Sequence, residues 1–179
     1  DFPFYYLGQI INTNFSYQTP KNLQVLGEKN GYQHLWLEGR GKASKETHQF
    51  TFLNKQTFYT ISSANQLEDE LLLTRIGAND PEFNLRRDPG FMIRRKAKNT
   101  VFASIIEPHG GYSYVSEFSK GANSNIAEVA VVYDDKYYTA VSIKTVKGVV
   151  GLLIIANNSR DTTKKHSVKI KDKKYSWKG

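Results

Sequence analysis

Short runs of alternating apolar and polar residues, separated by turn residues, fill most of the chain. Alternation with a period of two is typical of strands that bury one face, and a short polar gap between two such runs predicts a hairpin. The pattern predicts four hairpins, which pair residues 49–53 with 57–61, 91–95 with 100–106, 126–133 with 137–145, and 167–170 with 175–177. A further apolar run follows the third hairpin at residues 149–156. The C-terminal third is therefore predicted to be a meander of consecutive antiparallel strands.

The segment before Thr74 is the one place with signals for a helix start. Ser and Asn precede acidic residues and leucines there, which is a pattern that can begin a helix. The apolar run is short, however, and it continues into the next strand-like residues. We therefore predict a polar loop over residues 62–69 and a strand over residues 70–76. The whole pattern predicts one all-β domain over residues 1–179, with stacked antiparallel sheets in a β-sandwich-like meander.

Composition agrees with an all-β chain and excludes several classes of protein. The 179 residues include 10 Phe and 11 Tyr, which favour strands, and no cysteine, which excludes disulfides and thiolate metal sites. No apolar run reaches the roughly 18 residues that a membrane helix requires, so we expect no membrane span. The chain begins without Met, and its first residues already have a strand pattern. We therefore expect a piece of a longer polypeptide or a processed product.

The net charge of +8 is concentrated at the C-terminal end, where residues 160–179 contain eight Lys or Arg and two Asp. A basic end can attract a polyanion such as nucleic acid or an acidic polysaccharide. Lysines also protect an edge strand from pairing with other chains. Because Lys outnumbers Arg here, and lysine lacks bidentate geometry, the pattern favours edge protection over a specific site.

The segment 105–114 is the best candidate for chemistry. An apolar strand ends in Glu107, a proline and His109, and two glycines then precede Tyr112. Glu, His and Tyr on one loop can bind a sugar or transfer protons. The alternative is a β-turn whose glycines supply positive φ, and the residues alone do not decide between the two. The other histidines lack the spacing of metal ligands, so we assign no metal site.

A second basic cluster, at residues 86–87 and 94–96, lies near two phenylalanines. Basic and aromatic residues together can bind single-stranded nucleic acid or a uronate polymer. Adjacent arginines on a strand point to opposite faces, so at most one of each pair would face a given partner. Arg86 is the candidate that we carry forward for contact with substrate.

Six phrases of the chain together resemble the C-terminal β-domain of the family-17 polysaccharide lyases, which are oligoalginate lyases of the heparinase II/III-like group. They occur in the family's order and cover most of the chain, at residues 5–9, 30–39, 74–87, 100–110, 166–170 and 175–177. The resemblance implies stacked antiparallel sheets that follow an N-terminal α/α-toroid. It also implies cleavage of alginate by β-elimination in a bacterial periplasmic or secreted enzyme.

The resemblance further implies that the catalytic Asn-His pair and Tyr, and a structural zinc site, all precede Asp1. Tyr5 and Tyr6 stand where many relatives carry a His, so the chain is expected to hold no metal ligand and no cofactor. Glu107 matches the acidic residue of a loop that helps to close one end of the cleft in exolytic members. His109 and Tyr112 would then be its neighbours at the substrate.

Two other functions remain open from the sequence. The first is a stand-alone module that binds acidic polysaccharide through the basic end and exposed aromatic residues. The second is a nucleic-acid-binding protein, which the lack of any recognised nucleic-acid motif disfavours. We therefore expect alginate or oligoalginate as the ligand and no nucleic acid. We also expect the chain to pack against an N-terminal α/α-toroid catalytic domain of the same polypeptide.

Overall fold

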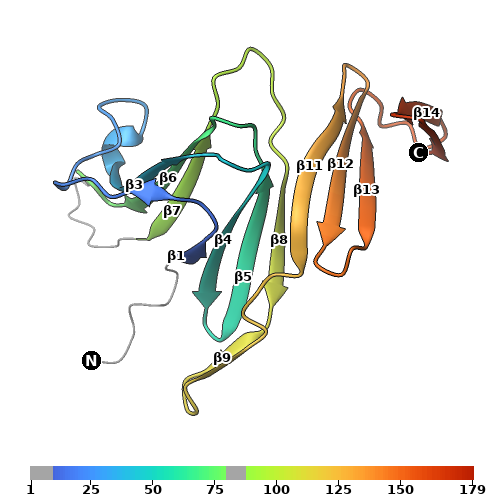
Figure 1. Cartoon of the computed structure of the whole chain (residues 1–179). Coiled ribbons are helices and arrows are strands. Elements are labelled where there is room, and N and C mark those ends of the chain that lie inside the picture. The colour runs from blue at the N-terminus through green and yellow to red at the C-terminus, as the bar shows by residue number, and fades with distance from the viewer. Residues whose placement is uncertain (1–9, 80–87) are drawn as a thin grey trace.

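The computed structural model describes residues 10–79 and 88–179, and the described part is built from antiparallel sheets stacked in a row (Figure 1). The first sheet has the strand order β2-β3-β6-β7 and the second has the order β1-β4-β5-β8. The third sheet has the order β11-β12-β13, and the two-stranded β14–β15 ribbon follows it. Strands β9 and β10 form a separate hairpin. The prediction of an all-β chain with stacked antiparallel sheets is thereby confirmed.

The strands are short, and their bounds are as follows. The first sheet contains β2 (Tyr17–Gln18), β3 (Leu35–Lys42), β6 (Glu70–Ile76) and β7 (Pro89–Arg94), and a short 3₁₀ helix, η2 (Tyr32–His34), precedes β3. The second contains β1 (Ile10–Thr13), β4 (Thr47–Asn54), β5 (Thr57–Ala64) and β8 (Ser104–His109). The third contains β11 (Ile126–Asp134), β12 (Tyr138–Thr145) and β13 (Val150–Ala156). The remaining strands are β9 (Gly111–Ser113), β10 (Phe118–Lys120), β14 (Lys165–Ile170) and β15 (Lys173–Lys178).

A separate apolar cluster lies between each pair of neighbouring layers. Phe50 of β4 is fully buried between the first two sheets and stacks on Phe91 of β7, with ring centroids 4.0 Å apart. Val129 and Val141 fill the space between the second and third sheets. Val168 packs beneath the third sheet and joins it to the β14–β15 ribbon. Burial of these side chains holds the layers together, because no single thin sheet buries enough apolar surface by itself.

Three of the four predicted hairpins are confirmed. Strands β4 and β5 pair around residues 54–57, β11 pairs with β12, and β14 pairs with β15. Strand β13 pairs with β12, which confirms the predicted C-terminal meander. The predicted loop before β6 is shorter than expected, because β5 continues to Ala64, but the strand over residues 70–76 is confirmed.

The predicted hairpin between residues 91–95 and 100–106 is wrong. Strand β7 pairs instead with β6, where Leu71 lies opposite Ile93. Strand β8 pairs with β5 in the second sheet, where Ile61 lies opposite Ile106. The chain therefore crosses from one layer to the next between β7 and β8, and the meander is restricted to the C-terminal part. A polar gap between two apolar runs cannot distinguish a hairpin from a connection between layers.

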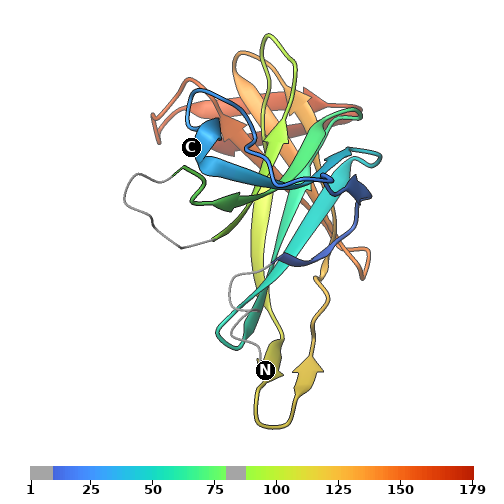
Figure 2. The same cartoon turned by 90° about the vertical axis from the view of Figure 1, so that its left-hand side faces the viewer.

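The β9–β10 hairpin extends beyond the lower end of the second sheet in both views (Figures 1 and 2). It leaves β8 at Gly110 and returns toward β11 through residues 121–125. Much of the hairpin is exposed, including Val115 at its tip and Phe118 on β10. Within residues 10–79 and 88–179, none of the helical structure has the length and hydrophobicity that a membrane crossing requires.

Candidate functional site

The end of β8 brings Glu107 and His109 close to the base of the β9–β10 hairpin. His109 is buried, and both of its ring nitrogens have partners. Its Nε2 lies 2.8 Å from the hydroxyl of Thr60 on β5, and its Nδ1 lies 2.8 Å from the carbonyl oxygen of Gly121. The imidazole also stacks on Phe58, with ring centroids 6.1 Å apart. His109 therefore connects the sheet to the returning strand of the hairpin.

Two glycines allow the outgoing and returning chains to pass close to each other at the hairpin base. Gly110 has φ of +52°, and a Cβ atom there would lie 2.1 Å from the carbonyl oxygen of Gly121. Gly121 itself has φ of +63°. A larger residue at position 110 would both strain the backbone and collide with it. The turn alternative placed a β-turn at the glycine pair, but Gly111 begins β9 and only Gly110 of the pair has positive φ. The turn of the hairpin lies further along, at residues 114–117.

Glu107 holds the loop that follows the hairpin. The hydroxyl of Ser124 donates to Glu107 Oε2, the Asn125 side-chain amide donates to Oε1 at 2.9 Å, and the Asn125 backbone N–H donates to Oε2 at 3.0 Å. Burial raises the pKa of the Glu107 carboxyl, but these hydrogen bonds outweigh burial, and its pKa lies below the usual value. The side chain is half-buried and charged at neutral pH. It is poorly suited to act as a general acid, because it holds its proton only in acid solution.

Tyr112 lies on the hairpin itself and lines an open hollow. Its backbone N–H donates to the carbonyl of Gln56 at 2.9 Å, which ties β9 to the β4–β5 turn. Its ring meets the ring of Tyr114 edge to face at 5.0 Å. Phe118 and Lys120 of β10 line the same hollow, which has a volume of about 480 Å³. Phe118 and Lys120 share one face of the hairpin, whereas Tyr112 pairs with Ser119, so its ring belongs to the other face. The aromatic ring of Phe118 beside the cation of Lys120 suits an anionic sugar.

The structure describes three of the four predicted site residues, and these three lie close together along the chain. Glu107, His109 and Tyr112 all belong to β8 and the hairpin that follows it. Arg86 lies outside the described residues. The sequence reasoning missed Phe118 and Lys120, because the turn that returns them to Tyr112 contains no Asn-Gly or Asp-Gly signal.

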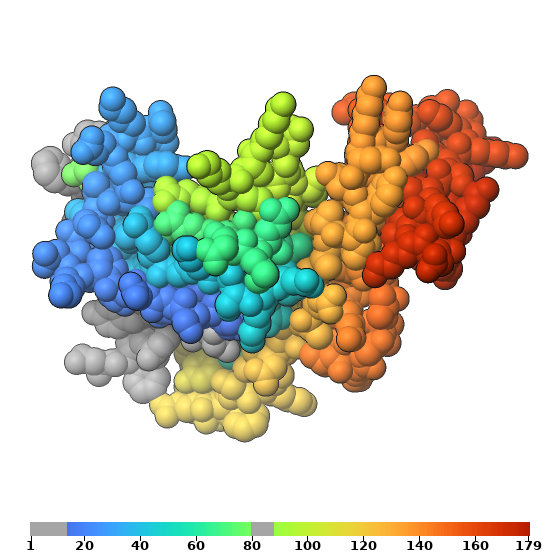
Figure 3. Space-filling model, turned by 45° about the horizontal axis from the view of Figure 1, so that its top comes forward, coloured from blue at the N-terminus to red at the C-terminus, as the bar shows by residue number. Residues whose placement is uncertain are grey.

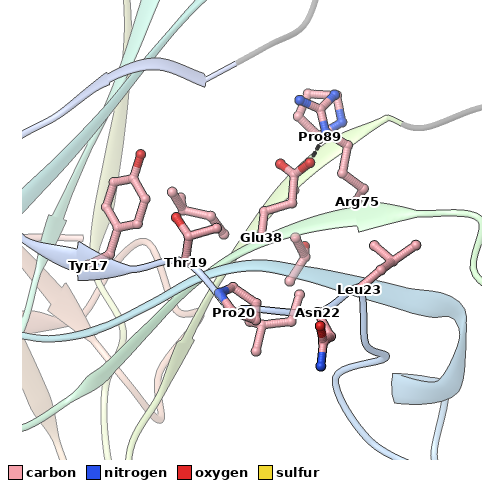
Figure 4. Close-up of a pocket in the computed structure, with 12 residues that line it drawn as sticks. Tyr17, Thr19, Pro20, Asn22, Leu23, Glu38, Arg75 and Pro89 are labelled. Atoms are coloured by element: carbon pink, nitrogen blue, oxygen red, sulfur yellow. Dashed lines mark hydrogen bonds and ion pairs between the residues drawn. The ribbon is translucent and has the colours of Figure 1, made fainter.

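A second hollow of about 410 Å³ lies on the first sheet, outside the predicted site. Figure 4 shows Glu38 of β3 and Arg75 of β6 joined across it, and Arg75 Nε donates to Glu38 Oε1 at 2.7 Å. The exposed ring of Tyr17 and the side chain of Leu23 line other parts of its wall. The carboxylate and guanidinium neutralise each other, so the pair provides no net charge for an anionic ligand.

A third hollow is a groove of about 840 Å³ between the second and third sheets. It is visible in Figure 3 as the gap between the projecting segment near residue 100 and the β11–β12 turn. Its lining mixes acidic, basic and apolar side chains, among them Glu128, Asp134 and Lys171. Glu107, His109 and Tyr112 do not line this groove. Among the described residues, no group of three or more His, Asp or Glu could hold a metal ion.

The fold defines an all-β protein of stacked antiparallel sheets that presents a projecting hairpin with an aromatic hollow. No family model matches the chain. It is 37% identical over 181 residues to an alginate lyase of Stenotrophomonas maltophilia strain K279a, and this alignment covers the whole chain and 24% of that protein. It is 36% identical over 186 residues to an exo-oligoalginate lyase of Saccharophagus degradans strain 2-40, again over the whole chain and 25% of that protein.

The chain thus spans about a quarter of the length of the curated relatives that it matches. Similarity at this level along the whole chain confirms the predicted resemblance to a segment of alginate lyases. The finer assignment to family 17 and to the heparinase II/III-like group stays a prediction.

Proposed function

We propose that this chain is the β-sheet region of an alginate or oligoalginate lyase of polysaccharide lyase family 17. The observation that carries the proposal is similarity over the whole chain, at 36–37% identity, to a segment of two alginate lyases. The catalytic groups for β-elimination would lie in an α/α-toroid outside this chain. The sheets would support that domain and shape one end of its cleft. The enzyme would act in the bacterial periplasm or outside the cell, where it meets the polymer.

Within this function, we assign the substrate contact to the β9–β10 hairpin. Tyr112 would stack on a sugar ring at one face of the hairpin, and Lys120 would approach a uronate carboxylate at the other face, because Tyr112 pairs with Ser119 and Lys120 with Gly111. Glu107 and His109 would act as positioning residues, since their polar atoms already bind residues 121–125 and Thr60. This refines the prediction that all three touch substrate. The role of Arg86 as a further contact stays a prediction.

The direct test is an elimination assay on the full polypeptide that contains this chain. The expected result is release of unsaturated uronate from alginate oligomers, followed by its ultraviolet absorbance. The 179-residue chain alone should produce none, with circular dichroism used to verify that it is folded. Turnover by the chain alone would contradict the assignment of catalysis to the rest of the protein. A full polypeptide inactive on every uronate polymer would contradict the proposed function itself.

The hairpin contact is tested by Tyr112→Ala in the full polypeptide. We expect kcat/KM on alginate oligomers to fall roughly tenfold, which corresponds to a loss of about 1.4 kcal/mol of transition-state binding. The matched control is Tyr137→Ala, which removes an exposed tyrosine from a loop of the third sheet. An equal effect of the two substitutions would show that the hairpin does not contact substrate.

A further inference from the structure

The outward face of the β14–β15 ribbon presents lysines and serines only. We define this lysine face as Lys165, Ser167 and Lys169 of β14, together with Lys174, Ser176 and Lys178 of β15. All six side chains are exposed. The alternate residues of β14 are buried, as the pattern of a strand with one covered face requires.

The strand register places the lysines directly opposite one another. Lys165 pairs with Lys178, and Lys169 pairs with Lys174. Between them, Ser167 pairs with Ser176, and their hydroxyl oxygens lie 3.2 Å apart. Directly opposed side chains have Cβ atoms about 5 Å apart. Four residues of strand separate the two lysine pairs by roughly 13 Å, so the face carries four positive charges in a compact rectangle.

The ribbon is held rigidly enough to keep this arrangement. On its inner face, His166 stacks on Trp177 with ring centroids 5.2 Å apart, and Tyr138 of the third sheet meets Trp177 edge to face at 5.6 Å. Val168 and Ile170 are buried against the same sheet. The two aromatic residues of β15 are therefore committed to the inner face, and the lysine face has no aromatic platform.

The charges on the lysine face are not neutralised within the described part of the chain. None of its four lysines takes part in the ion pairs formed among residues 10–79 and 88–179. Asp172, in the turn, is the only acidic residue between positions 165 and 178. Like charges placed directly opposite each other destabilise a strand pair. Protection of an edge strand needs charge but does not need opposed like charges, so the arrangement suits an anionic ligand better than edge protection alone.

We propose that the lysine face is an accessory binding surface for an acidic polysaccharide, and this inference rests on the proposed function for the choice of a uronate polymer. Lysine ammonium groups would approach carboxylates as point charges, and the serine hydroxyls would donate to sugar oxygens. The surface lies at the end of the stack opposite the first sheet and far from the β9–β10 hairpin (Figures 1 and 2). A long polymer bound there leaves the hollow at Tyr112 free. The surface therefore retains polymer near the enzyme without competing for the cleft.

The test uses the full polypeptide with the substitutions Lys169→Gln and Lys174→Gln together. The matched control is Lys98→Gln with Lys147→Gln, which removes the same charge from two exposed turn lysines. Binding of long alginate is measured by titration at low and high ionic strength, beside elimination kinetics on short oligomers. Long polyanions release counterions when cations bind them, so loss of two contacts should lower the slope of log affinity against log salt by roughly one to two.

We expect the ribbon variant to bind long alginate several-fold more weakly at low salt, with the control variant unchanged and the difference lost at high salt. Oligomer kinetics should be the same in all three proteins. Equal polymer affinity of ribbon variant and wild type, with elimination intact, would overturn this inference and leave the proposed function standing. A tighter lysine-dependent affinity for single-stranded DNA than for alginate would overturn the polysaccharide assignment. Failure of elimination in every protein would instead count against the proposed function.

Discussion

His109 illustrates how a single side chain can fix the position of a projecting element. Both ring nitrogens are used, and the bonds go to β5 on one side and to the chain after β10 on the other. A hairpin of two three-residue strands has little stability of its own. The position of the hairpin relative to the sheet therefore depends on contacts at its base. His109 supplies a contact that joins β5 of the sheet to the chain that follows β10.

We expect His109→Phe to lower the free energy of unfolding by about 1–3 kcal/mol, because the Gly121 carbonyl loses a buried partner while ring packing is kept. Denaturant unfolding followed by fluorescence measures the change. His34→Phe is the control, since the His34 side chain is exposed and its Nδ1 makes a single, partly buried contact with the Ala78 carbonyl at 3.1 Å. If both variants were as stable as the wild type, the anchoring role of His109 would be refuted.

Glu107 should make stability depend on acid pH. Its pKa is lower in the folded chain than in the unfolded chain, so the carboxylate stabilises the fold above the unfolded value. That contribution is lost as the pH falls through the folded pKa. We expect Glu107→Gln to be less stable than the wild type at about pH 7 and to lose less stability between about pH 5 and pH 3. Denaturant titrations at both ends of this range measure the difference.

The control for this pH effect is Glu117→Gln, which changes an exposed carboxylate at the tip of the same hairpin. It should retain the wild-type loss of stability in acid. A Glu107→Gln variant with the full wild-type pH dependence would show that the hydrogen bonds from Ser124 and Asn125 do not depend on the charge of the carboxylate.

At the scale of elements, one buried ion pair fixes the crossing from the first sheet to the second. Arg95 follows β7, and its Nε donates to Asp69 Oδ1 at 2.8 Å while a second nitrogen donates to Oδ2. The two side chains are only 5% and 2% exposed. Arg95 also binds Thr100 and the Val101 carbonyl, and so it holds the segment that leads toward β8.

Asp69→Asn should therefore destabilise the fold by about 3–5 kcal/mol, because it leaves a buried guanidinium without its counter-charge. Glu70→Gln is the natural comparison, since Glu70 pairs with Arg94 in a more exposed position and its loss should cost about 1 kcal/mol. Thermal unfolding of both variants ranks them. Equal losses of stability in the two variants would mean that burial of the Asp69–Arg95 ion pair does not increase its contribution to stability.

The elements predictable from sequence are those whose partners are close along the chain. The β4–β5, β11–β12 and β14–β15 hairpins have short polar turns between patterned strands, so local signals sufficed. The partner of β8 is β5, more than forty residues earlier in the same sheet, and the chain between them passes through the first sheet. Alternation in residues 104–109 contains no information about this pairing. The same applies to Arg95, whose role depends on a carboxylate 26 positions away.

The sequence predicted which residue types form the candidate site, but it did not predict which of them position the hairpin and which of them contact substrate. The run from Glu107 to Tyr112 contains the right residue types, and the structure does place them at one hairpin. Their division into positioning and contacting groups depends on Thr60, Gly121, Ser124 and Asn125, which lie 12 to 49 residues away from their partners. No spacing rule links those residues, so the sequence left binding and turn formation as equal alternatives.

At the scale of the whole molecule, the second and third sheets are joined by polar as well as apolar contacts. The buried hydroxyl of Thr47 on β4 donates to the Val129 carbonyl at 2.9 Å and accepts from the Val129 N–H at 3.0 Å. Gln49 of the same strand donates to the Ile126 carbonyl at 2.7 Å. These bonds satisfy backbone groups of β11, the strand of the third sheet that faces the second sheet. The Thr47 hydroxyl thus pairs with both backbone groups of Val129 in the neighbouring layer.

Thr47→Val keeps the shape of the side chain but leaves two buried backbone groups unpaired, at a cost of about 1–3 kcal/mol for each. The loss should be felt in the third sheet, so hydrogen exchange of the β11–β13 amides should accelerate more than exchange in the β4–β5 pair. Thr51→Val is the matched control, because Thr51 is buried on the same strand but bonds to Thr60 within its own sheet. It should accelerate exchange in the second sheet without a preferential effect on the third. If the two valine variants gave the same exchange pattern, the second and third sheets would unfold as one unit. The hydrogen bonds of Thr47 would then make no specific contribution to the packing of one sheet on the other.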